Sequence, residues 1–163
     1  MLDTSVLINF LAIDQADLLA DHPDYRFLIT DHVRVEVTEF YPEQFDRLQK
    51  LLRQHAFEQI RVDTPEELEI FSRLIAGRRL GAGESAAVAA AIHRGHALAI
   101  DDARATRLLL SLSPQTHVET TQSLIVRLIR KGMLTVKQAD CFKHEWETVH
   151  RFRLRFRSFS ELL

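Results

Sequence analysis

Short apolar runs alternate with longer amphipathic segments along the chain, and this alternation restricts the fold more than any other feature of the sequence. A short apolar run bounded by turn residues is typical of a buried strand, whereas apolar residues at helical spacing predict a helix. Strands separated by helices form βαβ units, which pair in parallel. We therefore expect an α/β protein with a central, mostly parallel sheet of about five strands. The expected strands are residues 1–2, 26–30, 60–62, 97–100 and 117–119.

The segments between these strands contain helix start and stop signals. Thr64-Pro65-Glu66-Glu67 combines a capping residue, a proline and an acidic first turn. Asp31 is expected to cap its helix, and Gly95 is suited to ending another. The expected helices cover residues 4–12, 31–41, 43–55, 64–76, 81–95, a stretch through 108–110, 121–131 and 135–146.

The composition is that of an ordinary soluble globular protein, with 46% hydrophobic and 27% charged residues in a chain of 163. This length predicts one domain over residues 1–163, in which residues 133–163 contribute a C-terminal helix and a basic extended tail. The chain has no apolar stretch of the roughly 20 residues that a spanning helix needs, and no basic secretory leader, so we expect no membrane association. Cys141 is the only cysteine, which excludes an internal disulfide and favours a cytoplasmic location.

Charge is distributed unevenly. Residues 1–60 contain 5 Lys/Arg and 11 Asp/Glu, whereas residues 103–163 contain 11 and 5. An acidic N-terminal part and a basic C-terminal part suggest that the protein binds cations and anions at different sites. In the tail, basic and apolar residues alternate with a period of two, which predicts an extended segment with one basic side. We expect this side to contact nucleic acid or a partner through Arg151, Arg153, Arg155 and Arg157, or to be a solvated edge.

Acidic residues follow several of the expected strands. Asp3 comes after the first strand, and Asp101 and Asp102 come after the fourth. Glu84 opens the helix that leads to the fourth strand, and Glu36 lies about one turn into the helix after the second. Because sites in open parallel sheets lie beyond the carboxyl ends of the strands, we expect these acids to face one cleft.

Such a cluster of carboxylates needs a cation. Two carboxylates about 4 Å apart repel by on the order of 4 kcal/mol at an effective dielectric near 20. Oxygen-only ligands, with no cysteine and no paired histidine motif, select Mg²⁺ or Mn²⁺ over zinc. Hard ions held by carboxylates in an open cleft activate water and stabilise charge on a phosphoryl group, which indicates phosphodiester hydrolysis.

At these residues the sequence resembles a known family, the PIN-domain nucleases. Each motif alone is weakly specific, but four in this order make a specific signal, and the resemblance extends over residues 3–132. The motifs are Asp3-Thr4-Ser5-Val6-Leu7-Ile8, Val33-Arg34-Val35-Glu36-Val37, Gly83-Glu84-Ser85-Ala86-Ala87 and Leu98-Ala99-Ile100-Asp101-Asp102.

The resemblance implies a three-layer α/β/α fold and a Mg²⁺- or Mn²⁺-dependent ribonuclease, commonly the toxin of a VapC-type toxin-antitoxin pair. The expected partners are RNA, an antitoxin protein and, as an open alternative, a second copy of the chain. The residues that match the family's catalytic and metal-binding acids are Asp3, Glu36, Glu84 and either Asp101 or Asp102. Thr4 and Ser5 match supporting hydroxyl positions, where a hydroxyl can orient a ligand water.

Two alternatives stay open at this stage. Only Met1 and Leu2 precede Asp3, where the family usually has a longer apolar strand, so the native start can lie upstream. A catalytically impaired PIN-like module that binds RNA or a protein is the alternative function. Asp3 and Glu84 also stand where helix starts favour acids, so capping is their alternative role.

Overall fold

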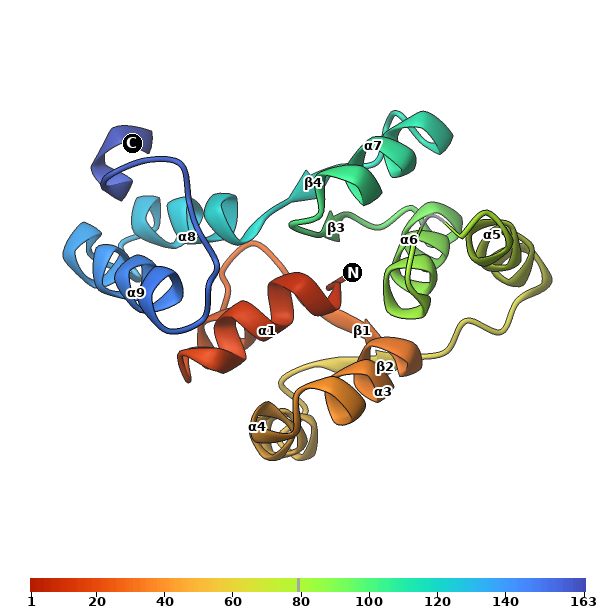
Figure 1. The fold of residues 1–163 in the computed structure, drawn as a ribbon, viewed down its shortest axis with the longest axis horizontal. Helices are drawn as coiled ribbons and strands as arrows, with labels where there is room; N and C mark the ends of the chain where they lie inside the picture. The colour runs from red at the N-terminus through yellow and green to blue at the C-terminus, as the bar shows by residue number, and fades with distance from the viewer. Residues whose placement is uncertain (79) are drawn as a thin grey trace.

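The computed structural model describes residues 1–78 and 80–163, and Figure 1 shows their arrangement. The strands are β1 (Leu28–Thr30), β2 (Glu58–Ile60), β3 (Leu98–Ala99) and β4 (Val118–Glu119). The helices are α1 (Thr4–Ala12), α2 (Asp17–Ala20), α3 (Asp31–Phe40), α4 (Pro42–Arg53), α5 (Pro65–Ala76), α6 (Ala82–Arg94), α7 (Ala103–Leu112), α8 (Thr121–Arg130), α9 (Val136–Thr148) and the 3₁₀ helix η1 (Phe159–Leu162). The expected α/β class is confirmed.

The described strands form two parallel pairs, β1 with β2 and β3 with β4. The start of the chain lies between the pairs: the Leu2 N–H donates to Leu28 O at 2.9 Å, and the Asp3 N–H donates to Ala99 O at 3.0 Å. Leu2 forms only an isolated parallel bridge with Ala99, so the described residues contain two two-stranded sheets instead of the expected sheet of about five strands.

Alternate strand residues point to opposite faces and enter two different cores. Leu2, Ile29 and Ala99 belong to a cluster that α1, α3, α4, α8 and α9 cover. Met1, Leu98 and Ile100 belong to a second cluster, which α5, α6 and α7 cover. The helices therefore lie on both faces of the strands, and the strand residues that enter these two cores are apolar.

Local capping agrees with the expected helix ends in most places. Thr64 forms a capping box with Glu67 at the start of α5, and Gly95 ends α6 in the left-handed region with φ 65°. The expected cap at Asp31 is wrong: Thr30 caps α3 by accepting the Val33 N–H at 3.2 Å, and Asp31 is the first helical residue. A β-branched hydroxyl residue can end a strand and cap the next helix, which leaves no linker between them.

Several boundaries also differ from expectation. The third strand is Glu58–Ile60 and not residues 60–62, because Leu28 and Thr30 of β1 pair with Glu58 and Ile60. The short helices α2 and η1 were not expected, since neither contains a full turn of periodic apolar residues.

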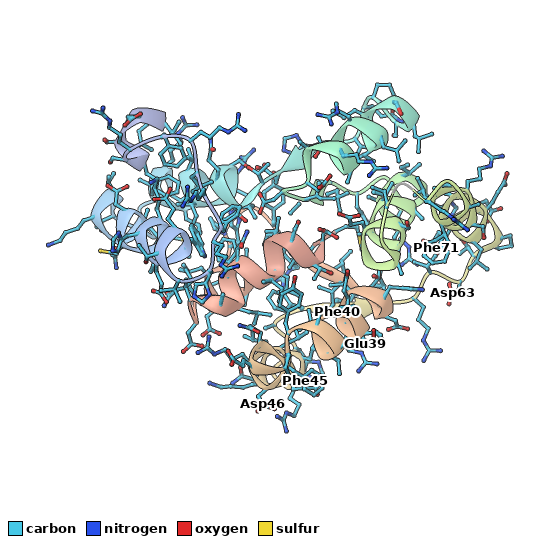
Figure 2. The ribbon with its side chains drawn as sticks, viewed as in Figure 1. Glu39, Phe40, Phe45, Asp46, Asp63 and Phe71 are labelled. Atoms are coloured by element: carbon cyan, nitrogen blue, oxygen red, sulfur yellow. The ribbon has the colours of Figure 1, made fainter. Side chains whose placement is uncertain are left out.

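The helices of the second face also contact α3. Phe71 of α5, labelled in Figure 2, lies with its ring centroid 4.9 Å from that of His32 on α3.

No helix in the described ranges is both long enough and apolar enough to cross a membrane.

Candidate active site

Asp3 lies at the centre of the predicted site, between the end of the first strand segment and the start of α1. Its side chain is fully buried and caps α1, with Oδ2 accepting the Ser5 N–H at 3.0 Å and the Ser5 hydroxyl at 2.6 Å. In the described chain, Oδ1 has no hydrogen-bond partner. Burial raises the pKa of Asp3 to about 6, against the lowering effect of the Ser5 hydrogen bonds and with a contribution from the charges of Glu84 and Glu36.

Glu36 reaches the site from the middle of α3. Its Oε2 accepts a hydrogen bond of 2.6 Å from the Thr4 hydroxyl. A β-carbon at position 83 would lie 1.9 Å from this oxygen, so the glycine at that position is what admits the carboxylate. Glu39, labelled in Figure 2, lies one turn further along α3 and is exposed, which leaves Glu36 as the acid of this helix at the site.

Glu84 stands in the first turn of α6, and its Oε2 accepts the Gly81 N–H at 3.0 Å. This carboxylate therefore has the capping role considered above. Burial raises the pKa of Glu84, and the charges of Asp102 and Glu36 raise it further. The charges of Glu36 and Asp102 therefore both act on Glu84.

The two candidates for the fourth acid are in different environments. Asp101 is held on both oxygens: Oδ1 accepts the Thr121 N–H at 2.9 Å, and Oδ2 accepts the Thr121 hydroxyl at 2.5 Å and the Asn9 amide at 2.9 Å. Asp102 is exposed and caps α7 through Oδ1, which accepts the N–H groups of Arg104 and Ala105 at 2.7 Å. Hydrogen bonds thus tie Asp101 to α1 and α8, whereas Asp102 is exposed and its charge contributes to the raised pKa of Glu84.

The hydroxyls of Thr4 and Ser5 contact the acids directly. Thr4 holds Glu36, as described, and the Ser5 hydroxyl donates to Asp3 while accepting the Asp101 N–H at 3.1 Å. Ser5 therefore connects two of the acidic motifs. Both hydroxyls thus contact protein carboxylates directly, and their expected role in orienting a ligand water stays a prediction.

The donor chemistry of the site fits a hard divalent cation. The donors are carboxylate oxygens, and the unpartnered, buried Oδ1 of Asp3 is the kind of atom that a cation would satisfy. Hydrogen bonds to Ser5, Thr4 and Gly81 hold the carboxylates of Asp3, Glu36 and Glu84 individually. Within residues 1–78 and 80–163, no three His, Cys, Asp or Glu side chains are already gathered into a metal-binding group.

Sequence reasoning gave no site role to Asn9, Thr121 or Gly83, although Gly83 is the first residue of the third motif. Asn9 is a buried polar residue between Ile8 and Phe10 in an otherwise apolar helix, and that contrast is a usable signal. Thr121 follows β4 in the same way as Asp3 follows the first strand, so its position after a strand also marks it. Gly83 carries no signal of its own, because a glycine in a helical first turn has many explanations.

The basic tail follows α9 in the chain. Its four arginines are exposed. Phe152, Leu154 and Phe156 are half-buried and pack on the core that α1, α8 and α9 cover. The expected alternation of a basic and an apolar side is confirmed.

The comparisons with known proteins agree with the motifs. A family model described as PIN domain matches residues 1–140, and the chain therefore belongs to the PIN-domain family. PIN domains are generally nucleases and typically use divalent metal ions, which supports a nuclease-type role. Comparison with curated proteins found no match, and neither did comparison with solved structures.

Proposed function

We propose that this protein is a Mg²⁺- or Mn²⁺-dependent endoribonuclease that hydrolyses RNA phosphodiester bonds. The observation that supports this most is the state of Asp3: a fully buried carboxylate with one unpartnered oxygen, coupled electrostatically to Glu36 and Glu84. A buried carboxylate without a compensating cation is costly, so its retention at this position favours an ion-binding role. Membership of the PIN-domain family supports nuclease chemistry at this site.

The residues would divide the work as follows. Asp3, Glu36, Glu84 and Asp102 would hold the ion. When bound, the ion would supply an activated water at neutral pH and charge stabilisation at the phosphoryl oxygens. The Ser5 hydroxyl engages Oδ2 of Asp3 and so leaves Oδ1 available. Asp101 would act through Asn9 and Ser5 as a positioning residue.

We further propose that the enzyme is the toxin of a toxin-antitoxin pair, restrained by an antitoxin protein. The support is the likeness of the four acidic motifs to PIN-domain nucleases, which are commonly the toxins of VapC-type pairs. Co-expression with the product of the adjacent open reading frame tests this proposal. A complex that blocks RNA cleavage is expected, and a neighbouring product that neither binds nor inhibits would contradict it.

One observation favours a second candidate function, a module that binds RNA or a protein without cutting. It is the lack of a ready group of three metal-binding side chains in the described part of the chain. Such a module would keep the PIN fold and the basic tail but would respond weakly to divalent ions.

Thermal unfolding with and without Mn²⁺ separates the two candidates. An ion that binds only the folded protein stabilises it by about 2.7 kcal/mol at 100 times its dissociation constant. We expect millimolar Mn²⁺ to raise Tm, and we expect Glu36→Gln, Glu84→Gln and Asp102→Asn each to reduce the rise. If Mn²⁺ leaves Tm unchanged, the binding module becomes the better account.

A further inference from the structure

The C-terminal tail is fixed on the protein surface at both ends. The Phe152 N–H donates to Trp146 O at 3.0 Å, and the two rings pack edge to face with centroids 5.7 Å apart. At the other end, Ser158 Oγ and the Phe159 N–H donate to Asp140 at 2.7 and 2.8 Å. The segment between these anchors, residues 151–157, therefore has a defined path although it belongs to no helix or strand.

The apolar side of this segment supports that path. Phe156 lies with its ring centroid 4.8 Å from that of Phe159 and 5.6 Å from Lys143 Nζ. The Leu154 N–H donates to Glu147 at 3.3 Å. Because the inner side chains are held, the outer side chains project from a surface that is ordered before any ligand arrives, and this lowers the entropic cost of binding.

The outer side carries arginines that form no ion pair with the described residues, although the charge of Arg153 contributes to the lowered pKa of Glu147. Among the described residues, no carboxylate lies within ion-pair distance of the guanidinium groups at positions 151, 153, 155 and 157. Glu147 is held by Lys143, which contacts both of its oxygens at 2.8 Å, and Glu161 accepts the backbone N–H of Arg157 at 3.1 Å. The nearby acids are thus used by Lys143 or by the backbone of the tail.

The tail is also connected to the acidic site. Trp146, on which Phe152 packs, donates its indole N–H to Asn9 O at 2.7 Å, and the Asn9 amide donates to Asp101 at 2.9 Å. Asn9 lies six residues after Asp3 on α1, which is roughly 9 Å along a helix. Hydrogen bonds of Trp146, Asn9 and Asp101 thus link the tail to the acidic site through the interior.

From these observations we infer that Arg151, Arg153, Arg155 and Arg157 form a track for the phosphate backbone of single-stranded RNA. This inference rests on the proposed ribonuclease function and adds a substrate contact outside the acidic cluster. Arginine is the side chain best suited to phosphate, because its planar donors can bind two oxygens at once. The segment exposes no large apolar side chain for a protein partner to bury, which favours a polyanion over a protein interface.

The test is the salt dependence of RNA binding by the full-length protein in EDTA, with Asp3→Asn present to prevent cleavage. The probe is a fluorescein-labelled 20-nucleotide oligouridylate. Four phosphate contacts on a single strand should contribute about -3 to the slope of log affinity against log salt. Changing the four arginines to Gln should remove that contribution, so that the added roughly 50-fold loss of affinity between 50 and 200 mM salt disappears.

Two further variants control the experiment. Lys50, Arg53, Arg61 and Arg73 are exposed cations outside the tail, and changing them to Gln alters the net charge equally. This control variant should keep the original slope. Changing the four tail arginines to Lys should also keep most of it, since the charges remain.

The outcomes decide between the alternatives. An unchanged slope in the tail variant, or an equal change in the control variant, would overturn the track. A tail variant that binds RNA normally but fails to bind a co-expressed acidic protein would also overturn the track. That result would assign the arginines to the protein partner. The experiment measures binding without cleavage, so failure of the ribonuclease proposal would appear separately, as intact RNA after incubation of the unmodified protein with Mn²⁺.

Discussion

The carboxylate of Glu36 occupies the space that a side chain at position 83 would need. Its Oε2 accepts the Thr4 hydroxyl at 2.6 Å, and a β-carbon on Gly83 would lie 1.9 Å from the same oxygen. Three acidic-site segments, the starts of α1 and α6 and the middle of α3, therefore meet at one contact. The approach of Glu36 depends on the smallest residue in the first turn of α6.

Gly83→Ala should displace Glu36 and reduce cleavage strongly, with little change in stability. The displaced carboxylate costs stability, but alanine gains up to about 1 kcal/mol over glycine in a helix. Gly81→Ala is the matched control, because its β-carbon would lie 3.8 Å from Glu36 and 3.9 Å from Glu84, at ordinary contact distance. Cleavage rates and Tm of both variants check this. Equal activity in the two variants would show that the Glu36 contact has no importance for the reaction.

Asp3→Asn should stabilise the metal-free protein above pH 6. The pKa of Asp3 is raised from 3.8 to about 6, so between these values the unfolded chain releases a proton that the folded protein retains. The free energy of unfolding therefore falls as pH rises through this window, by up to about 3 kcal/mol. The variant should lack this loss, and the two proteins should converge below pH 4. Urea unfolding in EDTA measures the difference, and a variant much less stable than the original at pH 8 would identify Asp3 as purely structural.

Asp101→Asn and Asp102→Asn should have different effects on stability and on the response to Mn²⁺. Asp101 accepts three hydrogen bonds. The side-chain amide of asparagine would direct its N–H groups at one of these donors, which should lower the free energy of unfolding by about 1 to 3 kcal/mol. Asp102 is an exposed cap, and asparagine caps equally well, so Tm should hardly change. The Mn²⁺-induced rise in Tm should persist in Asp101→Asn and shrink in Asp102→Asn. The reverse pattern would make Asp101 the fourth ligand.

Glu119→Gln should destabilise the protein at neutral pH by roughly 2 kcal/mol. Burial alone would raise the pKa of Glu119, but hydrogen bonds from Ser123, Tyr25 and His117 and the charge of Arg127 lower it to about 2. The stability from this charge is present above pH 4.5 and is lost as pH falls from there toward 2.

The difference in stability between Glu119→Gln and the original protein should therefore shrink as pH falls toward 2. Glu69→Gln, which removes an exposed pair with Arg73, is the control and should cost less than about 1 kcal/mol. Equal Tm values for Glu119→Gln and the original protein at neutral pH would contradict the network's role.

The periodic and local features of the fold were predictable from the sequence. Amphipathic helices such as α5, with its capping box at Thr64, and the apolar runs of β1 and β3 carry their signals within a few residues. The exact ends of the strands are not predictable in this way, because pairing with a distant partner determines where each strand ends. The cap at Thr30 instead of Asp31 shows the same limit, since both residues are good caps and only the strand register chooses between them.

The candidate site was predictable as a set of residue types and less so as a geometry. The motifs single out Asp3, Glu36 and Glu84, and the charges of Glu36 and Glu84 contribute to the raised pKa of Asp3. The burial of Asp101 by Asn9 and Thr121 depends on contacts between residues far apart in the chain, which no local pattern encodes.

Cleavage of RNA by the purified protein tests the central claim most directly. A labelled single-stranded RNA of mixed sequence would be incubated with the protein in Mn²⁺, in Mg²⁺ and in EDTA, with Asp3→Asn in parallel. The proposed function predicts internal cleavage in the divalent ions, none in EDTA and none with Asp3→Asn. Intact RNA under every condition, or cleavage that persists in EDTA or in the Asp3→Asn variant, would contradict it.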